Sequence, residues 1–103
     1  MQSILMLIRI VRLTLQPDAT KSFEELFQAA APKIRQMQGC KRLELWVDST
    51  STNIFTTYSE WESKSSLKSY RESDLFKETW AEVKPLFAAP AMAHSYYLAQ
   101  LNR

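Results

Sequence analysis

Three side chains in this sequence could take part directly in chemistry: Trp61, Tyr70 and His94. The indole of Trp61 could stack on a flat substrate, and the phenol of Tyr70 could hydrogen-bond to a substrate oxygen. His94 is the only histidine, the residue type that most often serves as a general base near neutral pH. Each residue also has a structural interpretation, because Trp61 and Tyr70 could be core aromatics and His94 an exposed strand residue. The sequence therefore offers single catalytic candidates and no nucleophile–base pair.

Two further polar side chains could act on a charged substrate. Thr57 could donate a hydrogen bond to a developing oxyanion, although threonine also suits a strand for purely steric reasons. Arg9 could attract an anionic substrate, or could lie in solvent near the start of a strand. No metal site is expected, because a lone histidine without a nearby cysteine or clustered carboxylates gives too few ligands.

The elements that must position these residues follow the order β-α-β-β-α-β. Alternating apolar and polar residues predict four strands, over residues 7–15, 42–47, 54–61 and 92–101. Apolar residues at helical spacing predict a helix over residues 23–37 that ends near Gly39, and Ser63 and Ser73 can cap two shorter helices. With right-handed crossovers, this order gives an α+β ferredoxin-like sandwich, in which a four-stranded antiparallel sheet carries helices on one face.

Such a sandwich leaves the second face of its sheet uncovered. The alternation predicts that large apolar groups and charges of both signs share this open face: Ile8, Ile10, Arg12, Arg42, Glu44, Trp46, Ile54, Tyr58 and Glu60. An exposed apolar patch usually marks an interaction surface. Packing against a second copy could bury the aromatic groups and pair arginine with glutamate, which predicts a symmetric homodimer joined sheet to sheet. The alternative is a solvated amphipathic face with no partner.

Composition limits the remaining classes of function. The 103 residues suffice for one domain over residues 1–103, and residues 1–5 would be an extension if translation starts at Met6. The net charge of +2 comes from interspersed charges, so no nucleic-acid partner is expected. The apolar run 4–8 is too short to cross a membrane. The single cysteine, Cys40, excludes an internal disulfide and suits a reducing compartment, which predicts a cytoplasmic location.

The run from Tyr58 to Trp80 resembles the antibiotic biosynthesis monooxygenase family, through a strand end, the junction Trp61-Glu62-Ser63 and two helix starts. The resemblance covers nearly the whole chain, from about Leu7 to Leu98. It implies a dimeric α/β barrel with one pocket per subunit between helices and sheet. It also implies chemistry without a cofactor, because the best-known oxygenases of this family oxidise aromatic anthrones or quinols with molecular oxygen and use neither metal nor flavin.

The family's polar pocket pattern is only partly present. The polyketide oxygenases have an asparagine at the position of Thr57, a tryptophan matched by Trp61, and a tyrosine at the position of Leu67. A haem-degrading branch has an asparagine, a tryptophan and a histidine where this chain has Val11, Tyr70 and Trp80. Because the iron ligand is missing at that position, haem breakdown is not expected.

Together, the residues and the resemblance predict a substrate pocket walled by Arg9, Val11, Phe27, Thr57, Trp61, Tyr70, Phe76 and Trp80. The predicted function is monooxygenation of a small aromatic or quinol-like compound with O₂, in which the deprotonated substrate itself supplies the electron to oxygen. The alternative is a non-catalytic dimeric module that binds a small apolar ligand or has a structural role, since most of the known polar pocket residues are replaced.

Overall fold

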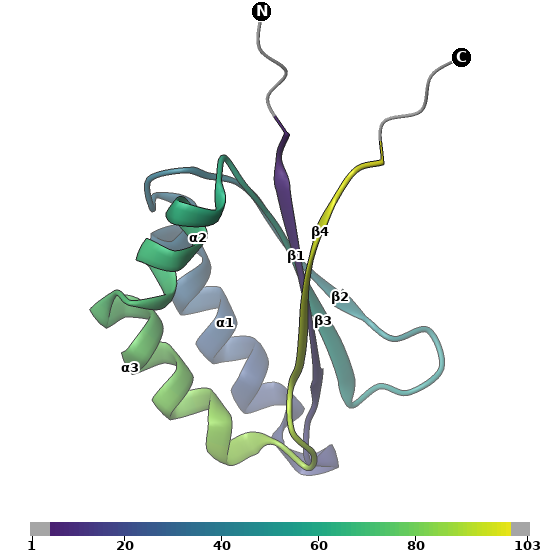
Figure 1. Ribbon diagram of the computed structural model, residues 1–103. Helices are drawn as coiled ribbons and strands as arrows, with labels where there is room; N and C mark the ends of the chain where they lie inside the picture. Colours follow the sequence, from purple (N-terminus) through teal and green to yellow (C-terminus); the bar gives the residue numbers. More distant parts are fainter. Residues whose placement is uncertain (1–4, 100–103) are drawn as a thin grey trace, which may run out of the picture.

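The computed structural model describes residues 5–99, and its helices cover only one face of the sheet (Figure 1). The elements follow in this order: β1 (Leu7–Thr14), the 3₁₀ turn η1 (Pro17–Ala19), α1 (Thr20–Arg35), β2 (Cys40–Val47), β3 (Ile54–Trp61), α2 (Lys64–Arg71), α3 (Asp74–Val83), the 3₁₀ turn η2 (Lys84–Leu86) and β4 (Met92–Tyr97). The predicted α+β ferredoxin-like class is confirmed. The second helical segment is divided into α2 and α3, as the two serine caps predict.

The strands pair antiparallel in the order β2-β3-β1-β4, so β1 lies inside the sheet between β3 and β4. This register places Val11 between Thr57 on one side and Ala93 on the other. One pair further along, Arg9 lies opposite Ser95 of β4. Because side chains alternate between the two faces of a strand, these residues share the sheet surface that faces the helices.

Serine side chains start both short helices. The Ser63 Oγ accepts a hydrogen bond from the backbone N–H of Ser66 at 3.1 Å, at the start of α2. The Ser73 Oγ accepts one from the backbone N–H of Phe76, also at 3.1 Å, at the start of α3. Each cap satisfies a backbone donor that has no partner within its helix. The caps fix the direction of α2 and α3, and therefore the aromatic side chains that these helices carry.

Gly39 has the predicted left-handed conformation, with φ of +86°. It does not end the helix directly, because α1 ends at Arg35 and a tight turn follows, closed by the Cys40 N–H donating to the Met37 carbonyl at 3.0 Å. A Cβ at Gly39 would lie only 2.3 Å from the Oγ of Ser66. The absence of a side chain therefore lets α2 approach this turn closely.

The buried core is divided into two clusters along the layer between sheet and helices. One contains Leu7, Ala30, Ala31, Ile34, Leu43, Trp61 and Leu67, and the other contains Leu13, Leu15, Phe23, Phe55 and Val83. Phe27 of α1 packs against both clusters. Burial of these side chains is the main force holding the helices on the sheet.

The sequence analysis extends the fourth strand too far toward the C-terminus, to residue 101. β4 ends at Tyr97, and Leu98 and Ala99 are not paired, while residues 100 and 101 lie outside the described residues. The predicted N-terminal extension also falls mainly outside them, since only Leu5 of residues 1–5 is described. Among residues 5–99, no helix is long and apolar enough to cross a membrane.

Candidate functional site

A cavity of about 310 Å³ lies between the sheet and the helices. Strands β1 and β3 and the start of β4 supply one wall, and residues of α1, α2 and α3 supply the other. All eight residues that the sequence analysis assigned to a pocket line it: Arg9, Val11, Phe27, Thr57, Trp61, Tyr70, Phe76 and Trp80. The alternation of β1 and β3 and the helical spacing of α2 and α3 bring them together.

A row of aromatic rings in contact lines the cavity, from the last residue of β3 to the middle of α3. Trp61 stacks on Tyr70, with ring centroids 5.0 Å apart and planes inclined by 21°. Tyr70 meets Phe76 edge to face at 5.2 Å, and Phe76 stacks on Trp80 at 5.8 Å. Contacts of this geometry add to the stabilisation from burial alone. The row therefore gives the cavity a firm, apolar surface that matches a flat, ring-shaped ligand.

Trp61 is mainly a packing residue. It is 1% exposed, and its indole N–H donates to the Oγ of Ser59 at 3.0 Å. Tyr70 covers one side of its ring. The indole nitrogen is therefore already hydrogen-bonded, and what Trp61 offers a ligand is apolar surface.

Tyr70 is the clearest hydrogen-bond donor for a ligand. Burial raises the pKa of its phenol to about 12, with a smaller contribution from Cys40, so the hydroxyl stays protonated near neutral pH. This hydroxyl makes no side-chain hydrogen bond to another residue within 5–99. The hydroxyl can therefore donate to an oxygen atom of a bound compound. Thr57, on the sheet side of the cavity, is another hydroxyl-bearing residue of the lining.

Arg9 lines the cavity, and its Nη1 donates to the Oγ of Ser95 at 3.0 Å. Burial lowers the pKa of Arg9, and the positive charge of Arg71 lowers it further. No carboxylate of the described residues lies within 4.0 Å of either guanidinium. Arg71 also lines the cavity, so one end of an otherwise apolar space is positively charged.

His94 is not brought to this cavity. It lies on β4 opposite Ile10, and its exposed ring is 6.3 Å from that of Tyr96. Its neighbour Ala93 lines the cavity instead. Because the side-chain period of a strand is two residues, His94 faces the open side of the sheet, away from Tyr70. A role for His94 as the base in this cavity would require a different register of β4.

The sequence analysis missed several cavity residues, among them Ser59, Arg71 and Thr79. Two of these positions follow a readable pattern, since Ser59 lies between Thr57 and Trp61 on one strand face, and Thr79 is three residues after Phe76 on one helix face. Arg71 follows no such pattern. It ends α2, and only the packing of that helix against the sheet places its guanidinium near Arg9.

The described residues offer no conventional metal centre. Within 5–99, no three side chains of the types His, Cys, Asp and Glu are grouped so that they could hold an ion. Cys40 is half-buried, and burial raises the pKa of its thiol.

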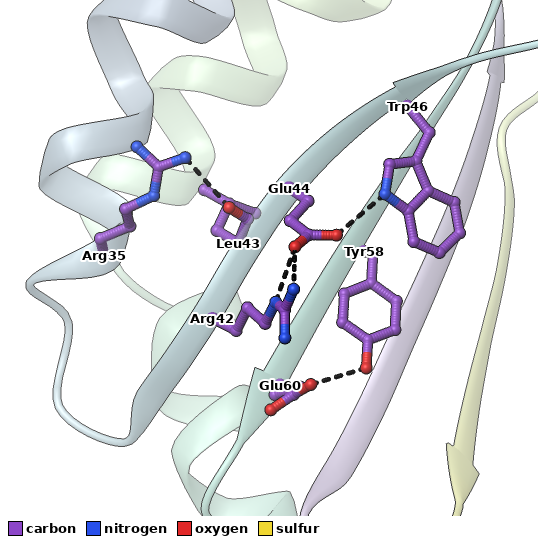
Figure 2. A network of polar contacts seen from close by, with 7 residues as sticks. All are labelled: Arg35, Arg42, Leu43, Glu44, Trp46, Tyr58 and Glu60. Atoms are coloured by element: carbon purple, nitrogen blue, oxygen red, sulfur yellow. Dashed lines mark hydrogen bonds and ion pairs between the residues drawn. The ribbon is translucent and has the colours of Figure 1, made fainter.

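The open face of the sheet carries a separate network of polar contacts (Figure 2). Glu44 accepts hydrogen bonds from the Arg42 Nε at 2.7 Å and from the Trp46 indole N–H at 3.0 Å. The hydrogen bond from Trp46, followed by that from Arg42, lowers the pKa of Glu44. The Tyr58 hydroxyl donates to Glu60 at 2.6 Å, and its ring stacks on Trp46 at 5.0 Å. Arg42 thus has an acidic partner within its own chain.

The comparison with protein families identifies the family of this chain. The family profile of the antibiotic biosynthesis monooxygenases matches residues 6–82, a range that includes all eight predicted pocket residues. The chain belongs to this family. A comparison with curated proteins found no match.

Solved structures share the fold of this member of the antibiotic biosynthesis monooxygenase family. A conserved protein from Methanosarcina mazei Go1 is 19% identical, with a TM-score of 0.87 over 90% of this chain and 92% of that chain. A candidate antibiotic biosynthesis monooxygenase from Nitrosomonas europaea is 16% identical, with a TM-score of 0.87 over 94% and 93%. Another from Caulobacter crescentus is 22% identical, with a TM-score of 0.87 over 94% and 92%. At these identities, the likeness establishes the fold.

Proposed function

We propose that this protein is a monooxygenase that oxidises a small aromatic, quinol-like compound with O₂ inside the cavity. The observation that carries the proposal is the aromatic-walled cavity of about 310 Å³ in a chain of this family. A purely structural module has no use for such a space, because a void between two core clusters forfeits packing contacts. Several structural neighbours also carry the description of antibiotic biosynthesis monooxygenase, which agrees with an oxidative role.

The proposed reaction converts an activated ring CH₂, present in the keto tautomer of the substrate, into a carbonyl. One oxygen atom of O₂ enters the substrate and the other leaves as water, so the CH₂ carbon supplies the electrons and both hydrogens. The reactive form is the enolate, which forms when the CH₂ loses a proton. We propose that the hydroxyls of Tyr70 and Thr57 donate hydrogen bonds to its oxygen and that the apolar walls exclude water.

The proposal names no catalytic base in the cavity. Arg9 favours the deprotonated substrate through its positive charge, because a nearby cation lowers the pKa of an acid. The proton can then pass to water at the charged end of the cavity. This assigns Tyr70 and Thr57 to stabilising the anion, Arg9 to promoting its formation, and Trp61 to shaping the wall.

We also propose that two copies pair through the open sheet face and that the protein acts in the cytoplasm. Large apolar groups remain exposed there in the single chain, including Trp46 at 44%, Tyr96 at 50% and Met92 at 58%. A stable interface would bury such groups. The single cysteine agrees with a reducing compartment.

Oxygen uptake tests the proposed function. The purified protein would be incubated with 1,4-dihydroxynaphthalene, anthrone and related compounds, and O₂ consumption would be compared with the rate without protein. Ala30 lines the cavity and its neighbour Ala29 is exposed on the outer side of α1. We therefore expect Ala30→Phe to obstruct the cavity and remove most of the uptake, while Ala29→Phe retains it.

Circular dichroism of both variants would show whether each still folds. Uptake no faster than the uncatalysed rate with every compound would contradict the proposal. Uptake that survives Ala30→Phe in a folded protein would place the reaction elsewhere. Binding of the compounds without turnover would instead support the non-catalytic, ligand-binding alternative.

A further inference from the structure

A second hollow adjoins the charged end of the cavity. This hollow has a volume of about 520 Å³ and shares four residues with the cavity: Arg9, Leu67, Arg71 and Phe76. It continues along α2 past Lys64 and Lys68. The shared residues show that the two spaces are adjacent, with both arginines at their boundary.

Positive charge is concentrated at this junction. Four of the chain's 13 lysines and arginines line the hollow, against one of its 11 acidic residues. That single acid, Glu72, is paired with Lys68, whose Nζ lies 3.3 Å from its Oε2. Arg9 and Arg71 have no carboxylate within 4.0 Å among residues 5–99. Arg71 lies close enough to Arg9 to lower the pKa of Arg9, and neither guanidinium has an acidic partner there. An anion bound between them would therefore stabilise this site.

We infer that the ligand of the cavity is an aromatic carboxylate, whose ring lies against the aromatic wall and whose carboxylate binds between Arg9 and Arg71. This inference rests on the proposed function for the assumption that the cavity holds the substrate. A guanidinium presents five N–H donors in a planar fork that fits a carboxylate. Arg9 uses one of its groups to bind Ser95, which orients the side chain and leaves other donors free.

The geometry also gives the substrate a direction. The anionic group stays at the junction with the hollow, where the guanidiniums and water are, and the apolar ring reaches in toward Trp80. The ring system then lies along the aromatic row, with Thr57 among the residues of the sheet wall that face it. A carboxylate at one edge of the substrate would thus determine which carbon atom is oxidised.

Binding of unreactive compounds tests this inference separately from the reaction. The probes are 2-naphthoate and its neutral analogue 2-naphthamide, measured by calorimetry or by quenching of tryptophan fluorescence. Hydrogen bonds to charged groups predict that 2-naphthoate binds about 10-fold more tightly than 2-naphthamide. We expect Arg9→Gln and Arg71→Gln each to remove most of this preference by weakening the binding of 2-naphthoate far more than that of 2-naphthamide.

Lys77→Gln is the matched control, because it removes one positive charge from an exposed position of α3 outside both spaces. It should keep the preference. Salt gives a second measure that needs no variant, since raising NaCl from about 0.05 M to about 0.5 M should weaken 2-naphthoate binding and spare 2-naphthamide. If the two probes bind equally, if 2-naphthoate does not bind, or if Lys77→Gln acts like Arg9→Gln, the inference is overturned.

The outcome separates this inference from the proposed function. Preferential binding of 2-naphthoate through both arginines, without O₂ uptake on any quinol, would support the carboxylate site and refute the monooxygenase. Uptake with neutral quinols and equal affinity for both probes would support the monooxygenase and refute the carboxylate site. 1,4-Dihydroxy-2-naphthoate joins the two tests, and we expect its KM to rise about 10-fold in Arg71→Gln.

Discussion

Gly39 offers the sharpest test of how the fold holds α2 over the cavity. The residue has φ of +86°, and a Cβ built there lies 2.3 Å from the Oγ and 2.5 Å from the Cβ of Ser66. Moving the Ser66 hydroxyl would relieve only the first contact, because its Cβ is fixed to the backbone of α2. In Gly39→Ala, either the turn or the helix must therefore shift.

The expected cost has two parts. A left-handed conformation costs a residue with a Cβ about 1–2 kcal/mol, and forcing an extra group into a packed contact costs about 1–3 kcal/mol. We therefore expect Gly39→Ala to lower the free energy of unfolding by about 2–5 kcal/mol, a large share of the roughly 5–15 kcal/mol typical of a domain. The unfolding can be followed in urea through tryptophan fluorescence, with Gln38→Ala as the neighbouring control.

A second variant separates the two parts. Ser66→Gly removes the contacting Cβ, so the double variant Gly39→Ala/Ser66→Gly should lose less stability than the two single losses added together, by about 1–3 kcal/mol. The backbone part, about 1–2 kcal/mol, should remain. A loss below about 1 kcal/mol in Gly39→Ala, or strict additivity in the double variant, would refute the reasoning that close approach to α2 requires glycine here.

Two further predictions concern the cavity and the open face. Because burial raises the pKa of Tyr70 to about 12, the unfolded chain loses this proton before the folded one does; stability from the neutral phenol is complete below about pH 10 and falls as pH rises toward 12. Urea titrations should show a steeper alkaline loss for the native protein than for Tyr70→Phe, and identical profiles would contradict the burial of the phenol. The second prediction concerns the dimer. In sedimentation, we expect the native protein to be a dimer at about micromolar concentration, because subunits joined by a stable interface remain associated at that concentration. Trp46→Glu should weaken that dimer and the exposed control Lys21→Glu should not; a native protein that sediments as a single copy would rule out the dimer.

Much of the fold could be predicted because short-range rules agree with one another. Ser63 and Ser73 precede apolar helical patterns, and each side chain caps its helix as expected. The alternation along β1 and β3 placed Arg9, Val11 and Thr57 on the surface that faces the helices. These features depend on a residue and its neighbours within one element, which is the information that a sequence pattern contains.

The remaining features depend on how separate elements meet. The side that His94 faces is set by the register of β4 against β1, and all six residues of β4 are exposed, so no buried pattern revealed it. The proximity of Arg71 to Arg9 depends on the position of α2 over the sheet. Gly39 was expected to end a helix, whereas its actual task is to admit Ser66.

The void between the two core clusters has a consequence for attempts to make this protein more heat-resistant. Larger side chains at Ala30 or Val11 would complete the packing around Phe27, and selection for survival at high temperature alone would favour them. Such variants would have a higher melting temperature but would no longer bind a ligand in the cavity. Screens for thermostable variants should therefore also measure ligand binding, so that they do not select proteins whose cavity is filled and inactive.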